Sequence, residues 1–146
     1  MSNGSIPTVV AMLVCDQIIN EEGTNKKSLI GVFDNFFSLT FPGVLPRLAV
    51  YVKMADAGGD YFFKLRIVKL KDEALIAEVG IQARFHDITQ YGELALNLPP
   101  MPIPEPGKYE IQLYSGDEYL HRITINAVLG QMPEGGSPLW PQPQHS

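Results

Sequence analysis

Nucleophilic catalysis requires a nucleophilic side chain beside a general base, and the sequence offers few residues of either kind. The chain has one cysteine, Cys15, and three histidines, His86, His121 and His145. Cys15 could act as a nucleophile if a nearby base stabilised its thiolate. However, Cys15 continues an alternating apolar row that starts at Val9, and a free cysteine in such a row usually behaves as a small buried hydrophobic residue. We therefore interpret Cys15 as structural, and a small Cys15-dependent enzyme stays an alternative.

Acidic residues gather at the expected turns, which makes calcium the best metal hypothesis. Sandwich domains of the C2 type bind calcium with loop aspartates, because calcium takes six to eight oxygen ligands. No compact Asp-x-Asp motif occurs, and the His-x-His spacing typical of zinc is also missing. We therefore expect no metal and no cofactor, and a calcium-binding C2-like module using the turn aspartates stays a second alternative. These aspartates include Asp16, Asp34, Asp56, Asp60, Asp72 and Asp117.

Composition and missing motifs exclude several other classes. A net charge of −5 argues against nucleic-acid binding, which needs clustered Lys and Arg. Neither a Gly-x-Ser-x-Gly elbow nor a phosphate-binding glycine loop is present. The apolar run 6–15 lacks a preceding basic residue and is too short to span a bilayer. We expect a non-enzymatic, cytoplasmic protein that binds neither nucleic acid nor membrane.

Apolar residues alternate at period two and turn residues interrupt them, which is typical of β-strands. The segments Arg47–Ala55 and Tyr61–Leu70 should form an antiparallel hairpin around the turn at 56–60. The prolines at 99–106 restrict that segment to a loop or an edge. The other predicted strands are Thr8–Val14, Leu29–Phe37, Leu75–Gln82, 94–98, 109–113 and 123–127.

About eight strands without helical crossovers predict an all-β fold. We expect an antiparallel two-sheet β-sandwich with an immunoglobulin-like or C2-like Greek key. Tyr109 follows a Pro-Gly turn, which predicts a tyrosine corner. Composition divides the chain into a flexible N-terminus (1–7), the sandwich domain (8–129) and a Pro/Gly-rich C-terminal tail (130–146) that contains Trp140.

The segment from Cys15 to Asn35 carries a family resemblance. Its Cys15-Asp16, Ile18-Ile19-Asn20-Glu21-Glu22 and Ser28-Leu29-Ile30-Gly31-Val32-Phe33-Asp34-Asn35 motifs resemble the signature of an uncharacterised bacterial family. The resemblance implies a bacterial β-sandwich and brings no catalytic or binding residue with it. We interpret the segment as a structural corner. Its structural residues are Cys15, Asp16, Asn20, Gly31 and Asp34, and the polar side chains among them should bond turn backbone at strand ends.

The first two predicted strands are apolar on both faces. A strand with one solvated face should not carry apolar residues on that face. Either the proline segment 99–106 covers the outer face, or a second copy or an unknown protein partner does. We therefore expect a protein-binding or assembly module. Its candidate interaction surface comprises Val10, Met12, Val14, Ile30, Val32 and Trp140.

Overall fold

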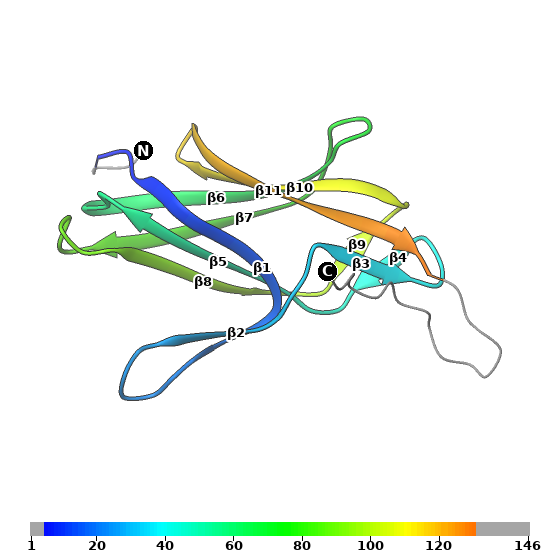
Figure 1. Cartoon of the computed structure of the whole chain (residues 1–146). Helices are drawn as coiled ribbons and strands as arrows, with labels where there is room; N and C mark the ends of the chain where they lie inside the picture. The colour runs from blue at the N-terminus through cyan, green and yellow to red at the C-terminus, as the bar shows by residue number, and fades with distance from the viewer. Residues whose placement is uncertain (1–4, 131–146) are drawn as a thin grey trace, which may run out of the picture.

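Residues 5–130, described by a computed structural model, form eleven β-strands. No helix that could cross a membrane occurs among these residues. Figure 1 shows the strands stacked in two layers that share one core. The strands are β1 (Thr8–Asn20), β2 (Lys27–Val32), β3 (Asn35–Ser38), β4 (Gly43–Leu45), β5 (Leu48–Ala55), β6 (Gly59–Lys69), β7 (Ala74–Phe85), β8 (Gly92–Leu98), β9 (Met101–Ile103), β10 (Gly107–Ser115) and β11 (Glu118–Leu129).

The layers are a four-stranded sheet in the order β2-β1-β5-β8 and a five-stranded sheet in the order β3-β11-β10-β6-β7. Immunoglobulin-like domains have the strands G, F and C adjacent in one sheet, and C′ is added in variable-type domains. Here β11, β10, β6 and β7 occupy those places. The predicted β-sandwich is therefore confirmed. One strand pair departs from the expected antiparallel arrangement, because β3 runs parallel to β11.

The predicted hairpin between residues 47–55 and 61–70 is wrong. β5 pairs with β1 and β8, whereas β6 pairs with β7 and β10 in the other sheet. The turn between them carries the chain across the sandwich, and its Ala57 is completely buried. The hydroxyl of Tyr61 accepts a hydrogen bond from the Gly58 N–H (3.0 Å) and donates one to the Ser5 carbonyl (2.6 Å). These bonds fix the crossing, which strand alternation alone does not reveal.

The predicted strand Leu29–Phe37 is also two strands. β2 ends at Val32 in the first sheet, and β3 begins at Asn35 in the second. The Asn126 N–H donates to the Asp34 carbonyl (2.9 Å), which ties the crossing residues to β11. The chain therefore changes sheets at Phe33 and Asp34, within an apolar run that reads as continuous.

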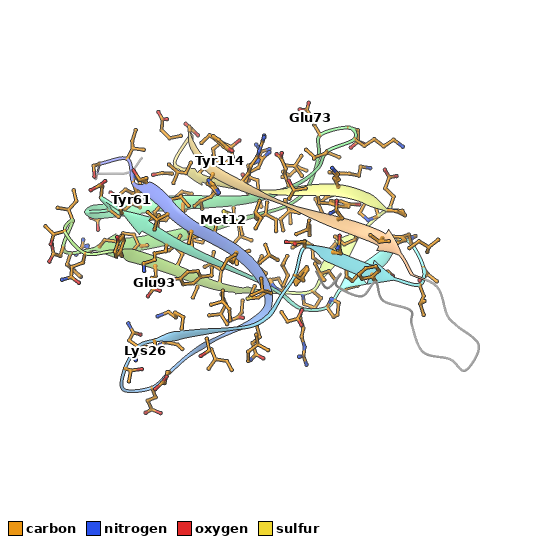
Figure 2. All side chains as sticks on the ribbon, in the orientation of Figure 1. Met12, Lys26, Tyr61, Glu73, Glu93 and Tyr114 are labelled. Carbon is orange, nitrogen blue, oxygen red and sulfur yellow. The ribbon has the colours of Figure 1, made fainter. Side chains whose placement is uncertain are left out.

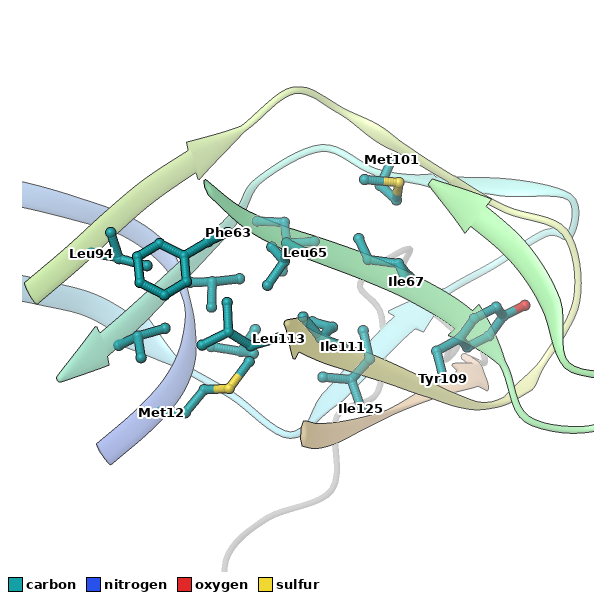
Figure 3. Packing of buried hydrophobic residues seen from close by; sticks show 14 of the residues in the cluster. Met12, Phe63, Leu65, Ile67, Leu94, Met101, Tyr109, Ile111, Leu113 and Ile125 are labelled. Carbon is teal, nitrogen blue, oxygen red and sulfur yellow. The ribbon is translucent and has the colours of Figure 1, made fainter. Parts of the chain in front are cut away.

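The core lies between the two sheets. Figure 3 shows Met12 from β1 and Leu94 from β8 packed opposite side chains of β6 and β10, including Phe63 and Leu113. Met101 and Ile103 of the proline segment also enter this core, and β9 pairs with β4. The segment therefore forms a short edge, as predicted, but it does not cover the outer face of β1.

Met12 and Val14 belong to this core, so their assignment to an interaction surface is wrong. They lie opposite Val52 and Val50 on β5 and are almost fully buried. The pairing of β1 with β5 shifts between Val9 and Ala11, which leaves Val10 as the extra residue. Such a bulge changes which residues point inward, and the sequence pattern does not show it.

Tyr109 has the geometry of a tyrosine corner at the start of β10. Its side chain is fully buried, and its hydroxyl donates to the Glu105 carbonyl (2.6 Å) and accepts from the Glu105 N–H (3.3 Å). Figure 3 shows the ring pointing into the sandwich beside Ile67. The hydroxyl thereby fixes the chain where it enters the second sheet.

Replacing Tyr109 by Phe should destabilise the fold by about 1–3 kcal/mol, because the Glu105 carbonyl and N–H lose their partner in a partly buried place. Urea denaturation of both proteins measures this difference. Tyr119→Phe is the matched control, because Tyr119 is exposed on β11; its effect should stay within about 0.5 kcal/mol. Equal stability of the Tyr109→Phe variant and the native chain would refute the corner.

Candidate functional site

β1 contacts two different strands along its length. It pairs with β5 as far as Cys15, and from Cys15 to Asn20 it pairs with β2. Figure 1 shows β1 turning back beside the first residues of β5, so that the β1–β2 hairpin runs beneath β8. We call residues 16–32 the flap. It lies over the outer faces of β5 and β8.

Apolar packing and one asparagine hold the flap against the sheet. Asn97 of β8 accepts a hydrogen bond from the Ile18 N–H (3.0 Å) and donates one to the Ile18 carbonyl (3.2 Å). Ile18 lies beyond the first residue of β5, so no strand is beside it on that side. The Asn97 side-chain amide therefore supplies the hydrogen-bond partners of the Ile18 backbone. A small second core forms beneath the flap, made of Cys15, Ile18, Leu29, Ala49, Tyr51 and Ala95.

A polar network holds the flap nearer its tip. The Lys27 ammonium lies 3.7 Å from a Glu93 carboxylate oxygen, and the Tyr51 hydroxyl donates to the same carboxylate. Burial, together with this bond to Glu93, raises the pKa of Tyr51 to about 12. Figure 2 shows Glu93 below β8, facing the flap. Lys26 marks the tip of the flap in the same view. The flap therefore covers part of the outer faces of β5 and β8, whereas we expected the proline segment or another subunit to cover the first two strands.

Gly31 and Asp16 form the corner at which the flap leaves the sandwich. The backbone of Gly31 is left-handed (φ 71°), a conformation that glycine adopts without steric cost. A Cβ at this position would lie 2.8 Å from Cγ of Asp16, so a side chain would also collide with Asp16. The corner thus favours glycine mainly for its backbone conformation, and any side chain would also displace the exposed Asp16 side chain.

The other polar residues of the segment do not act as predicted. Within residues 5–130, the side chains of Asp16, Asn20 and Asp34 form no hydrogen bond to turn backbone. Asp34 contributes its backbone carbonyl, and Asn35 accepts a bond from the side chain of Asn126 (3.2 Å). The backbone of Gly31 and the change of sheet shape this corner, in place of side-chain caps.

Cys15 is fully buried beneath the flap. Its thiol donates to the Gln17 carbonyl (3.5 Å), and burial raises its pKa, so the thiol stays protonated at neutral pH. His121 lies in β11 and His86 follows β7, both on the opposite sheet, and His145 lies outside the described residues. The described residues therefore do not assemble the Cys–His pair that the enzyme alternative requires.

The turn aspartates do not converge on a calcium site. In the part of the chain that the structure describes, no three acidic, histidine or cysteine side chains come together as possible metal ligands. Asp60 instead pairs with Arg84, Asp72 with Lys69 (3.1 Å) and Asp117 with Lys64 (3.3 Å). The turns that carry them are spread over the sandwich, which sequence spacing could not show.

Apolar side chains on the outer surface of β1 and β2 form the candidate interaction face. Of the predicted residues, Val10, Ile30 and Val32 are 49%, 46% and 55% exposed. Leu13 and Ile19 are also exposed, and the sequence pattern did not single them out. Trp140 lies outside the described residues. These strands are therefore apolar on both faces because one row of side chains is buried in the protein, while the other row is exposed to solvent.

A groove with a volume of about 410 Å³ opens beside the corner. Residues 31–33, 35–37 and 45–47 line it together with Asp16, and most of its lining is apolar. A smaller groove of about 300 Å³ shares Asp16, Pro46 and Arg47 with it. Neither Asp16 nor Arg47 forms a salt bridge within residues 5–130. The change of sheet at Phe33 brings these segments together, so no local motif signals the groove.

Comparisons with known proteins place the chain in a family. It belongs to the family described as "Family of unknown function (DUF6941)", whose profile matches residues 10–128. None of the curated proteins compared matches the sequence. A crystal structure of an immunoglobulin-like protein from Pseudomonas aeruginosa is similar, with 9% identity, a TM-score of 0.42, and coverage of 86% of this chain and 99% of that chain. The fold assignment rests on the sheet order, and this low likeness adds no argument to it.

Opening of the flap can be measured through Cys15. Labelling of native protein by a thiol reagent should be slow, and Asn97→Ala should accelerate it roughly 5- to 150-fold, because losing two hydrogen bonds lowers the opening free energy by about 1–3 kcal/mol. Asn126→Ala removes an asparagine bond elsewhere, from β11 to Asn35, and should leave the rate unchanged. Native labelling as fast as in the denatured chain would show that the flap does not cover Cys15.

Gly31→Ala tests the corner. It should cost about 1–2 kcal/mol for the left-handed backbone, and more because Asp16 must move. Gly23→Ala is the matched control, since Gly23 also has a positive φ (90°), but a Cβ added there would meet no neighbouring atom within 4 Å. Thermal unfolding should show the larger loss for Gly31→Ala, and adding Asp16→Ala should recover only the steric part. Equal losses at both glycines would contradict the collision with Asp16.

Proposed function

We propose that this chain is a non-enzymatic protein-binding module, because its exposed apolar surface favours recognition of another protein. The contact surface is the outward side of the flap together with the groove beside Gly31. The exposed row of β1 and β2, and Ile30 and Val32 in particular, is the observation that carries this proposal.

The arrangement of this row supports a contact surface. Gln17 lies opposite Ile30, so Ile19 and Ile30 are diagonal neighbours on adjacent strands. Val32 also lines the groove, which connects the exposed row to the groove's apolar lining. Single exposed apolar residues are ordinary, whereas a group of them leading into an apolar groove is typical of a protein-interaction site.

The groove also indicates what kind of partner would fit. Its apolar lining suits an aliphatic or aromatic side chain of a partner protein. Arg47 at its edge forms no salt bridge in the described chain and could pair with a carboxylate of that partner. We therefore expect the partner to insert an extended segment that carries an apolar anchor next to an acidic residue.

A photo-crosslinking amino acid at position 32, introduced into the full-length protein in cells, tests the proposal. It should trap a protein partner, and the purified partner should then bind the native chain in calorimetry. Ile30→Glu with Val32→Glu should weaken that binding at least tenfold, because each buried aliphatic side chain contributes about 1.5–3 kcal/mol. Tyr119→Ser, an exposed change on β11, should have no effect.

Two outcomes would overturn the proposal. The first is a partner that binds the doubly substituted chain as tightly as the native chain. The second is cross-linking of position 32 only to this same chain, either to residues 131–146 or to another copy. Circular dichroism of every variant confirms that the fold is retained.

A further inference from the structure

We infer that two copies of this chain pair along β7, antiparallel and centred on Ile81, so that the two five-stranded sheets join into one. In this arrangement Glu78 lies opposite Arg84 of the partner subunit. The inference uses the side of the molecule formed by β7 and does not depend on the flap or its groove.

β7 is the longest edge strand of the sandwich, and besides β6 it contacts the short strand β9. β7 has twelve residues, whereas the edge strands β3, β2 and β8 have four, six and seven. The flap also engages β8 through Glu93 and Asn97. β7 contains neither proline nor lysine, the residues that commonly block edges. Its pairing with β6 is regular over residues 77–85 and shifts only beyond Ala77.

Charge decides the register. Glu78 and Arg84 are the only charged residues of β7. A two-fold pairing centred on Ile81 sets each of them opposite the other in the second copy. A pairing centred on Glu78 or on Arg84 would instead place like charges face to face, which is unfavourable. Centring on the neighbouring Gly80 or Gln82 would leave both charges without an opposite partner.

The pairs already present within each chain strengthen this register. Arg66 of β6 lies 3.6 Å from Glu78, and Arg84 pairs with Asp60. In the proposed dimer these two pairs meet, giving a row of charges of alternating sign that crosses the junction. The row would run from Arg66 through Glu78 to Arg84 and Asp60 of the partner subunit. By symmetry it occurs twice.

The inward row of β7 suits the same arrangement. Val79, Ile81 and Ala83 are only half-buried, although they pack against the main core. Pairing centred on Ile81 sets Val79 opposite Ala83 of the partner subunit and the two Ile81 side chains opposite each other. It would therefore continue the apolar layer of one sandwich into the next, while the free N–H and C=O groups of the edge gain partners.

Charge-reversed variants of the full chain test the inference by sedimentation velocity and native mass spectrometry at roughly 100 µM, because an edge pairing of this size is expected to be weak. The native chain should form dimers. Glu78→Arg alone and Arg84→Glu alone should each weaken the dimer at least tenfold, because each creates two like-charge contacts. Mixed 1:1, these two variants should form a heterodimer as stable as the native dimer, since both contacts then join opposite charges.

The mixture carries its own control, because any repulsion within each variant chain is the same alone and mixed. Glu118→Arg, a charge reversal at the start of β11 in the same sheet, should leave the native dimer unchanged. A native chain that is monomeric at this concentration would overturn the inference, as would single variants that dimerise normally or a mixture that stays monomeric.

Cross-linking tests the register separately. In a Cys15→Ala background, Ile81→Cys should form a disulfide between copies under mild oxidation, because the two positions face each other. Leu75→Cys should not, since its two copies would lie far apart along the strands. A disulfide at position 75 and none at 81 would contradict the register centred on Ile81.

Discussion

Much of this structure depends on the sharp turn that β1 makes at Asp16, where Gly31 of β2 lies against it. β1 is a core strand up to Cys15, and immediately afterwards it must leave β5 and fold back over the sheet. Glycine suits this place because its backbone is left-handed and a Cβ there would meet the Asp16 side chain. The corner allows the flap to bury Ile18 and Leu29, and it starts the path that carries the chain through Phe33 into the second sheet. The second core, the groove and the parallel β3–β11 pair all follow from this one turn.

A β-sandwich has open edges that must be covered or blocked, and this molecule treats its edges unequally. The flap reaches β8 through Asn97 and Glu93, and β3 is short. β7 lacks lysine and proline, it contacts the short strand β9, and its two charges are of opposite sign. An edge that natural selection merely had to protect could carry lysine or proline. In the pairing proposed above, Glu78 and Arg84 would each meet an opposite charge across the junction.

Alternation of apolar residues was enough to predict the fold class, because buried strand rows leave a period of two that does not depend on topology. The tyrosine corner was also predictable, since the Pro-Gly turn and Tyr109 act within a few residues of each other. Strand partners were not. The prediction of a hairpin between β5 and β6 was wrong because a turn of this length can either join two paired strands or carry the chain to the other sheet. Local sequence does not distinguish the two.

The candidate surface was half predictable for a related physical reason. Val10, Ile30 and Val32 were identified correctly as exposed, whereas Met12 and Val14 were misassigned because one bulge at Val10 reverses the facing of the row. The groove was not predicted from the sequence, because its lining residues come from segments that meet only where the chain passes from the first sheet to the second. Polar groups that might have indicated chemistry are instead bound within the molecule, as Asp60, Asp72 and Glu93 show. On the described chain, apolar side chains of β1 and β2 stay exposed and β7 has no strand on its outer edge, and these are the two surfaces on which the proposals rest.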